Sequence, residues 1–346
     1  MKKLFTINKK GIFLVFSFCI CTLLLASCSK VNKGESNDAN QTPITKSSIK
    51  LNTAITITLY DSNDMSIIDA AFDLCDEYEE LLSRTIKSSE IAQLNESGTV
   101  PYELSETTAD LIKKGLEYGE ISKGYFDITI EPLTSLWNFG TNTKRPSDEE
   151  IRSAVEHVNY KDLILENQTI TFKEEGMGID LGAIAKGYIA DRIKDLLLEK
   201  GVKSAMINLG GNVLCVGSKP DGSPFNIGIQ KPFADRQETI AVMQLSDVSI
   251  VSSGIYERYF VEDDVTYHHI LNPETGLPID NNLISVTIIS PYSVDGDALS
   301  TSAFALGLEE GMELINSIED TYAIFITDDY ELHYSDGFFD NITIVE

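Results

Sequence analysis

The chain has 346 residues, of which 54 are Asp or Glu and 27 are Lys or Arg, so its formal net charge at pH 7 is −27. A surface this acidic repels phosphate backbones, and the composition therefore argues against nucleic-acid binding. A smaller ligand that carries phosphate would need a metal cation or local hydrogen-bond donors to offset the same repulsion.

The N-terminal residues have the layout of an export leader. Its positive charges are Lys2, Lys3, Lys9 and Lys10. Residues 11–26 carry no charge, and this run is shorter than the roughly 20 apolar residues of a spanning helix but typical of a signal peptide. The run leads through Leu-Ala-Ser into Cys28, which resembles the bacterial lipoprotein processing box. We expect residues 1–27 to be a lipoprotein signal peptide and Cys28 to be lipidated, which would anchor the protein on the extracytoplasmic side of the cell membrane. The alternative is an ordinary signal peptide that contains a cysteine.

Residues 28–47 follow as an expected flexible tether, because this polar stretch has almost no large apolar side chain to bury. Without the four leader lysines the charge is −31. Residues 48–346 are long enough for one large domain or two merged ones. In this region the only cysteines are Cys75 and Cys215, in apolar surroundings that favour buried thiols, although a disulfide between them is a second possibility.

Apolar periodicity predicts the secondary structure of the domain. Helical spacing is found at Ile68–Leu82, Thr107–Ser122, Ala183–Lys200 and about Ala298–Ile315. Strands are expected at Thr53–Tyr60, Ala205–Leu209, Asn226–Ile229, Ile240–Leu245, Arg258–Val261, Ile284–Ser290, Ala323–Thr327 and Ile342–Val345. Helices that cluster apart from a run of strands favour an α+β fold with a mainly antiparallel sheet over a doubly wound one.

Residues 124–129 (GYFDIT) bring Tyr125, Phe126 and Asp127 together. Aromatic rings with a polar group between them can face the flat ring of a cofactor. The alternative, which these residues alone favour, is a buried aromatic cluster in which Asp127 caps a turn.

Residues 178–187 (GIDLGAIAKG) lie where a helix is expected to begin. Glycines permit close backbone approach, and a helix N-terminus offers free N–H groups with partial positive charge. Asp180 would accept hydrogen bonds from a ligand and Lys186 would donate to one. The alternative is that Asp180 caps the helix and the glycines serve packing. The later sequence NLGGN, residues 208–212, favours a tight turn over a ligand loop.

His268 and His269 precede a turn marked by Asn-Pro and Thr-Gly. Neighbours on a strand point to opposite faces, so at most one of these rings is expected to face a given cleft. A lone histidine is usually structural, but near a cleft it is the natural proton carrier at neutral pH.

Asp297 and Thr301 are four residues apart, so their oxygens lie on one face if the segment is helical. A carboxylate with a hydroxyl suits Mg²⁺ better than zinc. The alternative, favoured when the pair is considered alone, makes Asp297 a helix N-cap and bonds Thr301 to its own backbone.

In this order the segments resemble the ApbE family, the FAD:protein FMN transferases. The matching stretches are GYFDIT, LWNFG, GIDLGAIAKGY, INLGGN, SSGIYER, HHILNPETG and DALSTSAFALG. The resemblance implies an α+β, ApbE-like (T-fold-like) domain with helices flanking the sheet. It also implies a Mg²⁺-dependent reaction in which a threonine hydroxyl of an acceptor protein attacks the FMN phosphorus of the substrate FAD and AMP leaves. The implied acceptors are flavoproteins of membrane or extracellular electron transfer.

The resemblance also assigns roles to residues of this chain. Asp297 and Thr301 match metal ligands, and Ala183 stands where a further ligand would come from its backbone carbonyl. His269 matches the histidine that would handle the threonine proton, and His268 is an extra one that should face away. The positions that match contacts to FAD are Tyr125, Phe126, Asp127, Asp180, Lys186 and, through its backbone, Ile270.

Three positions depart from the family pattern. Leu51-Asn52-Thr53 stands where Met-Gly-Thr is frequent, which leaves a flavin contact at Leu51 open. Asn212 and Asn272 stand where aspartate is commoner. Two other functions stay possible: a Mg²⁺-dependent FAD pyrophosphatase that yields FMN and AMP, and a lipoprotein that binds FAD or another solute without turnover.

Overall fold

The computed structural model describes residues 42–235 and 237–345. The expected signal peptide, Cys28 and most of the expected tether lie outside these described residues. None of the helices in the described ranges is long and apolar enough to cross a membrane. The α-helices are α1 (Met65–Leu82), α2 (Glu90–Glu96), α3 (Glu106–Ile121), α4 (Glu131–Trp137), α5 (Asp148–Val155), α6 (Ala185–Glu199), α7 (Ser293–Leu306), α8 (Leu308–Asn316) and α9 (Phe338–Asn341).

Most of the strands belong to one large sheet with the order β1-β2-β6-β7-β10-β13-β14-β15. Every neighbouring pair in it is antiparallel, which confirms the predicted α+β class. Its strands are β1 (Ile44–Lys50), β2 (Thr53–Leu59), β6 (Ala205–Leu209), β7 (Asn212–Val216), β10 (Ser249–Gly254), β13 (Leu283–Ser290), β14 (Tyr322–Thr327) and β15 (Leu332–Tyr334). Smaller sheets are formed by β3 (Tyr102–Glu103), β4 (Leu163–Glu166) and β5 (Thr169–Phe172), by β8 (Phe225–Gln230), β9 (Thr239–Leu245) and β16 (Thr343–Val345), and by β11 (Tyr259–Glu262) with β12 (Val265–His268).

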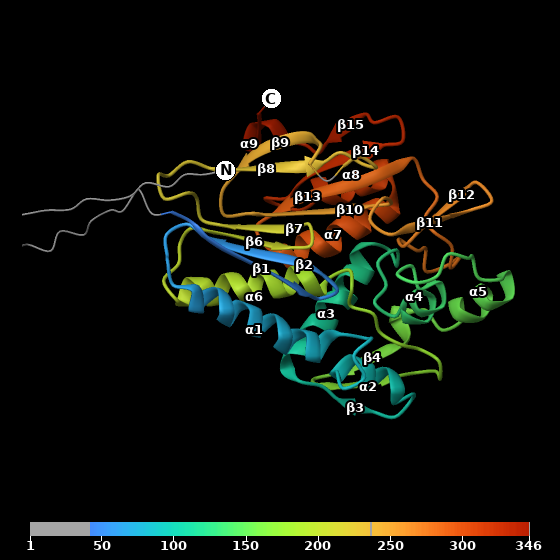
Figure 1. Cartoon of the computed structure of the whole chain (residues 1–346). Helices are drawn as coiled ribbons and strands as arrows, with labels where there is room; N and C mark the ends of the chain where they lie inside the picture. Colours follow the sequence, from blue (N-terminus) through green and yellow to red (C-terminus); the bar gives the residue numbers. More distant parts are fainter. Residues whose placement is uncertain (1–41, 236, 346) are drawn as a thin grey trace, which may run out of the picture. The chain divides into compact units, whose positions relative to one another are not determined.

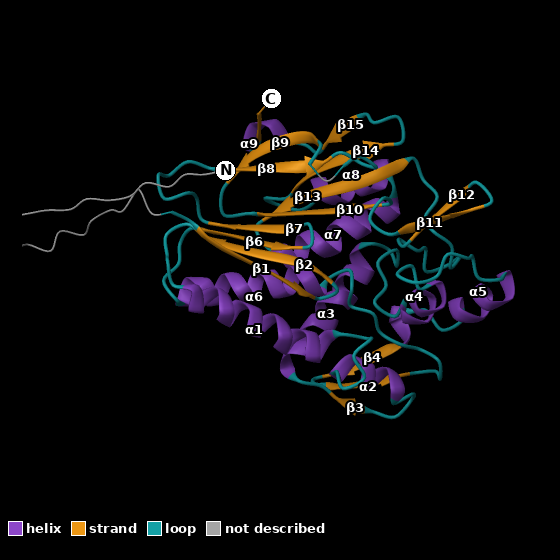
Figure 2. Ribbon diagram, viewed as in Figure 1, coloured by secondary structure: helices purple, strands orange, loops and turns teal. Residues whose placement is uncertain are grey.

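Both faces of the large sheet are covered, so it separates two hydrophobic cores. On one face α1, α6 and α7 pack against the strands, and on the other lie β8, β9, β16 and α9 (Figures 1 and 2). β13 is buried along its whole length, with Ile288 in the helix-side core and Ile289 in the other. Cys75 and Cys215 are both free thiols, one in each core, so the expectation of buried thiols is confirmed and a disulfide between them is excluded.

The expected single helix over Ala298–Ile315 is wrong in two respects. α7 begins five residues earlier, at Ser293, and the helix breaks at Gly307, after which α8 begins. Gly307 has φ +85°, a left-handed backbone conformation that favours glycine and interrupts helical hydrogen bonding.

The expected tether is too long at its C-terminal end, because residues 44–47 form the first half of β1. β1 pairs with β2 from Ile44 to Lys50. Because the sequence of β1 is polar, apolar periodicity did not predict this strand. Its hydroxyl groups nevertheless pair with those of β2: Thr45 Oγ1 lies 2.9 Å from Thr58 Oγ1, and Ser47 Oγ lies 2.8 Å from Thr56 Oγ1.

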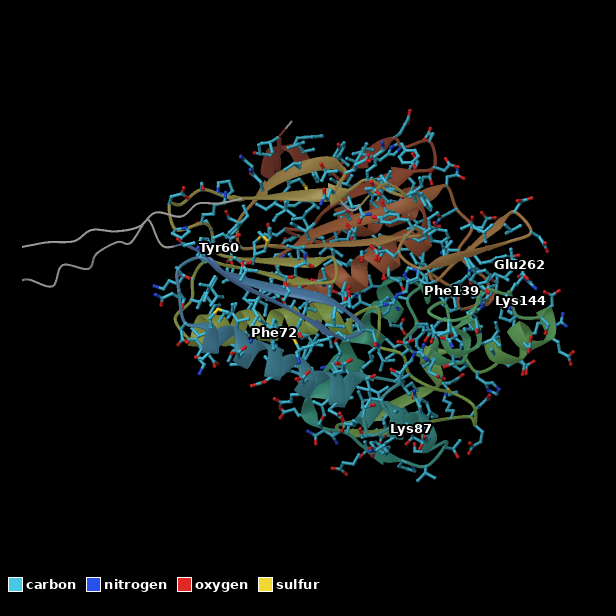
Figure 3. All side chains as sticks on the ribbon, in the orientation of Figure 1. Tyr60, Phe72, Lys87, Phe139, Lys144 and Glu262 are labelled. Carbon is cyan, nitrogen blue, oxygen red and sulfur yellow. The ribbon has the colours of Figure 1, made fainter. Side chains whose placement is uncertain are left out.

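An aromatic cluster joins α4 and α5 to the β11–β12 hairpin. The ring of Trp137 stacks on Phe139 at 5.3 Å and also contacts Phe260 and Tyr267 of the hairpin. Figure 3 shows Phe139 and Glu262 in this region, where the Glu262 carboxylate accepts a hydrogen bond of 2.7 Å from the Arg145 backbone. The cluster holds the hairpin that ends at His268.

The backbones of α6 and α7 approach each other closely at Gly187 and Ser293. A Cβ added at Gly187 would lie 2.2 Å from the Ser293 carbonyl oxygen, a distance that side-chain motion cannot relieve. The two helices therefore pack at this point only because residue 187 is glycine.

Gly187→Ala should destabilise the protein by about 3 kcal/mol, since the extra methyl forces the two helix backbones apart. The measurement is urea unfolding of the full-length chain. The control is Gly140→Ala, where an added Cβ meets no atom within 4 Å. An unfolding free energy equal to that of the control would contradict the packing described here.

Candidate active site

Asp297 is a buried carboxylate on α7 that reaches across to the first turn of α6. It is 4% exposed, and its Oδ2 accepts a hydrogen bond of 2.9 Å from the Gly187 backbone N–H. Lys186 Nζ lies 3.4 Å from Oδ1 of the same carboxylate. Because α7 begins at Ser293, Asp297 lies beyond the N-cap position, so the alternative that it caps this helix is wrong.

The same hydrogen bond has a consequence for Ala183. In a regular helix the N–H of residue 187 would donate to the carbonyl of residue 183. Here Gly187 donates to Asp297 instead, and α6 does not begin until Ala185. The half-buried Ala183 therefore lacks the hydrogen bond that its carbonyl oxygen would accept from residue 187 in a regular helix.

Thr301 lies one helical turn after Asp297 on the same face of α7. Its neighbours Ser300 and Ser302 bond to carbonyls of their own helix, at 2.9 Å and 2.8 Å. Thr301 Oγ1 is instead 3.2 Å from Ser253 Oγ at the end of β10. Thr301 of the predicted Asp297–Thr301 pair thus contacts a serine of the neighbouring strand β10.

The two adjacent histidines have different partners, which confirms that they face different ways. The buried ring of His268 contacts the Ile279 carbonyl through Nε2 at 3.0 Å and accepts the Ile270 N–H at Nδ1. His269 lies with Nδ1 3.3 Å from the Arg258 carbonyl oxygen. A carbonyl can only accept, so Nδ1 carries the proton and Nε2 keeps its lone pair.

Burial lowers the pKa of His269 well below its ordinary value of 6.5, and the positive charges of Arg258 and Lys186 act in the same direction. The imidazole is therefore neutral at physiological pH. Lys186, whose charge acts on His269, also contacts Asp297.

Asp180 links the segment before α6 to two other elements. Its Oδ2 accepts hydrogen bonds of 2.7 Å from Arg84 Nε and from Thr134 Oγ1. Oδ1 accepts from the Gly182 N–H at 2.8 Å. Asp180 therefore caps a local turn and not α6 itself, and a ligand at this carboxylate would share oxygens that already have partners.

The GYFDIT segment lies partly inside the core. Phe126 is buried against Tyr118, with ring centroids 6.0 Å apart. Asp127 accepts from the Thr129 N–H at 2.7 Å and the Tyr160 N–H at 2.9 Å. These contacts match the buried-cluster interpretation for two of the three residues, whereas Tyr125 is half-buried and reachable.

Ile270 is buried, and its backbone carbonyl accepts a hydrogen bond of 2.9 Å from the Ile279 N–H. The flavin contacts expected at Ile270 and at Tyr125, Phe126 and Asp127 stay predictions.

The residues at the three departures from the family pattern lie in a turn or form local hydrogen bonds. Leu51 and Asn52 form the β1–β2 turn with φ +53° and +55°, and asparagine tolerates this conformation best after glycine. Asn272 accepts from the Glu274 N–H at 2.8 Å, as an aspartate would. Asn212 Oδ1 accepts the Ser293 hydroxyl at 2.7 Å, close to the start of α7.

Ser253 and Asp191 were not among the site residues predicted from the sequence. Asp191 is a buried carboxylate on α6 that bonds to the first turn of α7. Asp191 could have been noticed as an acidic residue on the apolar side of a predicted helix. Ser253 could have been noticed as one of two consecutive serines in a buried strand.

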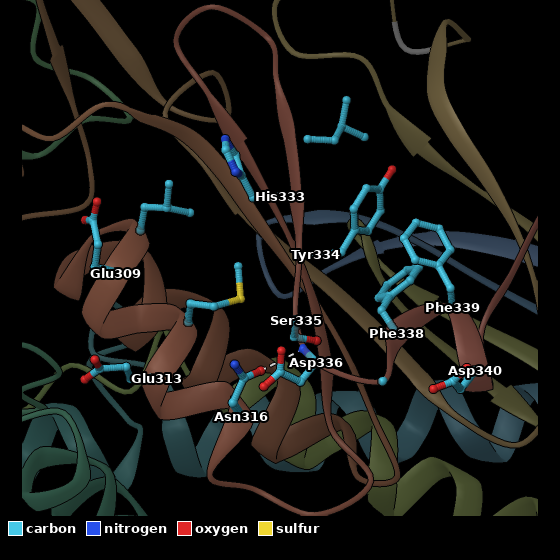
Figure 4. A pocket seen from close by; sticks show the side chains of 14 residues that line it. Glu309, Glu313, Asn316, His333, Tyr334, Ser335, Asp336, Phe338, Phe339 and Asp340 are labelled. Carbon is cyan, nitrogen blue, oxygen red and sulfur yellow. Dashed lines mark hydrogen bonds between the residues drawn. The ribbon is translucent and has the colours of Figure 1, made fainter.

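A groove of about 870 Å³ lies elsewhere, between α8, β15 and α9. Figure 4 shows Glu309 and Glu313 on one side of it and Tyr334, Phe338 and Phe339 on the other. None of the residues that line this groove was predicted as a site residue, so it is separate from the candidate active site.

Comparison with known proteins gives consistent matches over most of the chain. A model of the ApbE family matches residues 51–326. An FAD:protein FMN transferase of Klebsiella pneumoniae is 38% identical over 81% of this chain and 88% of its own length, and one of Treponema pallidum is 32% identical over 81% and 82%. Among solved structures, the ApbE protein of Thermotoga maritima has a TM-score of 0.79 at 30% identity, with 86% of this chain and 98% of that chain covered. The flavin transferase ApbE of Vibrio cholerae has a TM-score of 0.78 at 27% identity, with coverage of 86% and 99%.

Proposed function

This chain belongs to the ApbE family, and we propose that it transfers the FMN moiety of FAD to a threonine hydroxyl of an acceptor protein, with Mg²⁺ as the required metal. One observation carries the transfer itself: similar proteins that cover about four fifths of the chain are FAD:protein FMN transferases. The α6–α7 junction supplies side chains suited to this chemistry.

The donors at the junction fit Mg²⁺. Asp297 offers a carboxylate, Thr301 a hydroxyl and Ala183 a carbonyl freed from helical bonding. In the described residues no cluster of three or more His, Cys, Asp or Glu side chains is arranged to hold a metal. A set with a single carboxylate suits an ion that keeps water and substrate phosphate as its other ligands, as Mg²⁺ commonly does. When bound, the ion would neutralise charge on the phosphates of FAD, which this acidic chain otherwise repels.

We assign His269 as the base that accepts the proton of the acceptor threonine. Its Nε2 is unprotonated at neutral pH and would accept the proton of the threonine hydroxyl. The threonine oxygen then forms a bond to the FMN phosphorus while the bond from that phosphorus to the AMP oxygen breaks. Lys186, which contacts Asp297, would donate to a phosphate oxygen.

Transfer and hydrolysis differ only in the acceptor, since His269 would activate water in the same way.

We expect the full-length protein, FAD, Mg²⁺ and detergent-solubilised membranes from cells lacking this chain to yield AMP and a fluorescent protein with FMN on a threonine. Gel fluorescence and mass spectrometry measure the label, and chromatography measures AMP. AMP and free FMN at the same rate without membranes, and no labelled protein, would make the chain an FAD pyrophosphatase.

Two variants should separate metal binding from proton transfer. Asp297→Ala should lower the rate of AMP release by at least about a hundredfold at limiting Mg²⁺, because the only carboxylate of the proposed metal set is lost. His269→Ala should lower the rate about a hundredfold with little change in FAD affinity.

Matched controls are Asp295→Asn, whose carboxylate faces Lys114 and Tyr118, and His333→Ala at the separate groove. Full activity of Asp297→Ala at limiting Mg²⁺ would reject the metal assignment, and equal loss of rate and affinity in His269→Ala would make it a binding residue.

We further propose that Cys28 is lipidated and holds the domain on the extracytoplasmic side of the cell membrane, where the acceptors would be membrane or extracellular electron-transfer flavoproteins. The proposal rests on the leader sequence and its Leu-Ala-Ser-Cys end.

Cys28→Ser should move the protein out of the membrane pellet and remove the lipid mass from its N-terminus, while purified protein keeps its rate of AMP release. Fractionation and intact mass measure this. A variant that remained in the pellet, at the mass of the wild type, would contradict the anchor.

A further inference from the structure

The N-terminus of α7 is capped from another helix. Tyr292, at the N-cap position, supplies no side-chain hydrogen bond. Instead, Asp191 of α6 accepts the Ser293 N–H at 2.8 Å with Oδ1 and the Val294 N–H at 2.9 Å with Oδ2. A helix start leaves its first N–H groups without partners, and both oxygens of Asp191 serve that need from outside.

A second carboxylate makes the matching contact in the opposite direction. Asp297 of α7 accepts the backbone N–H of Gly187, one turn before Asp191 on α6. Each helix thus sends one buried carboxylate to the backbone of the other, on either side of the contact between Gly187 and the Ser293 carbonyl. These three hydrogen bonds, two accepted by Asp191 and one by Asp297, define the axial position of α7 against α6, which a single contact would leave free to slide.

Capping α7 with a buried carboxylate from another helix costs more desolvation free energy than capping it with an exposed side chain at its own N-cap position. Asp191 is 6% exposed, and burial raises its pKa to about 6, since the ionised form has lost its water. A polar side chain at residue 292 would satisfy the same N–H groups at the surface, where Tyr292 is 62% exposed. A local cap, however, cannot hold one helix in position against another.

We infer that Asp191 is a positioning residue that sets α7 against the start of α6, so that Asp297 and Thr301 meet the Ala183 carbonyl as one set of oxygen donors. The inference rests on the proposed metal-dependent function for its consequence, and on the three carboxylate–backbone hydrogen bonds for its geometry. Asp191 itself touches no donor of that set.

The test compares Asp191→Asn with Asp195→Asn in the full-length protein. Asp195 lies one turn later on α6 and pairs at the surface with Arg192, so it matches the substitution without touching α7. One readout is hydrogen exchange of the Gly187 amide, followed by mass spectrometry of peptides that cover residues 185–190. The other is the Mg²⁺ concentration that gives half-maximal AMP release, together with KM for FAD.

In Asp191→Asn we expect exchange at Gly187 to accelerate about tenfold, because its bond to Asp297 is no longer held in register. We expect the half-maximal Mg²⁺ concentration to rise about tenfold, with KM for FAD changed less than about twofold. Asp195→Asn should leave all three values unchanged.

A second variant separates positioning from capping. Asp191→Asn combined with Tyr292→Asp gives α7 a cap of its own and should restore thermal stability, and it also provides a folded protein if the single variant does not fold. Under the positioning role its Mg²⁺ requirement and Gly187 exchange stay raised. Return of both values to wild type would overturn the inference, as would unchanged Gly187 exchange in the single variant. Wild-type protein with no Mg²⁺-dependent AMP release would defeat the proposed function alone, because the exchange comparison does not depend on activity.

Discussion

The candidate site depends on one close approach of two helix backbones. Because Gly187 has no Cβ, α7 comes near enough for Asp297 to take the Gly187 N–H, and that bond leaves the Ala183 carbonyl without its usual helical donor. Thr301 then lies one turn further along α7, beside β10. This packing sets the Asp297 carboxylate against the start of α6 and the Thr301 hydroxyl against the end of β10, two segments distant in sequence.

Three cationic side chains lie at the candidate site of this acidic chain, and two of them are paired with carboxylates. The formal charge is −27, yet Arg84 pairs with Asp180, Lys186 contacts Asp297 and Arg258 lies beside His269. Lys186 lies at the start of α6, Arg84 contacts the segment before it, and Arg258 directly precedes β11 of the hairpin. Burial lowers the pKa of His269, and the charges of Arg258 and Lys186 act in the same direction, so the ring is neutral at physiological pH.

Periodicity located the elements with one clear apolar face, such as α1, α6, β2 and β6. It missed β1, whose sequence is polar, and β10, whose buried segment SIVSSG shows no alternation because it lies inside the sheet. Asp297 and Thr301 were found as a helical pair, and family resemblance added Ala183 and His269. The burial of Asp191 had a signal in the sequence but its role did not, since its partners lie 102 and 103 residues away and are backbone groups that no side-chain pattern reveals.

The two buried cysteines bear on how this chain reaches its folded form. Cys75 and Cys215 lie on opposite sides of the large sheet, and burial raises the pKa of each thiol to about 12, so neither is reactive once the domain is folded. Before folding, both sulfurs are open to oxidants, and outside the cytoplasm a bond between them would trap a chain that cannot form the sheet. In an oxidising compartment the native structure would protect the two thiols by sequestration and not by cross-linking.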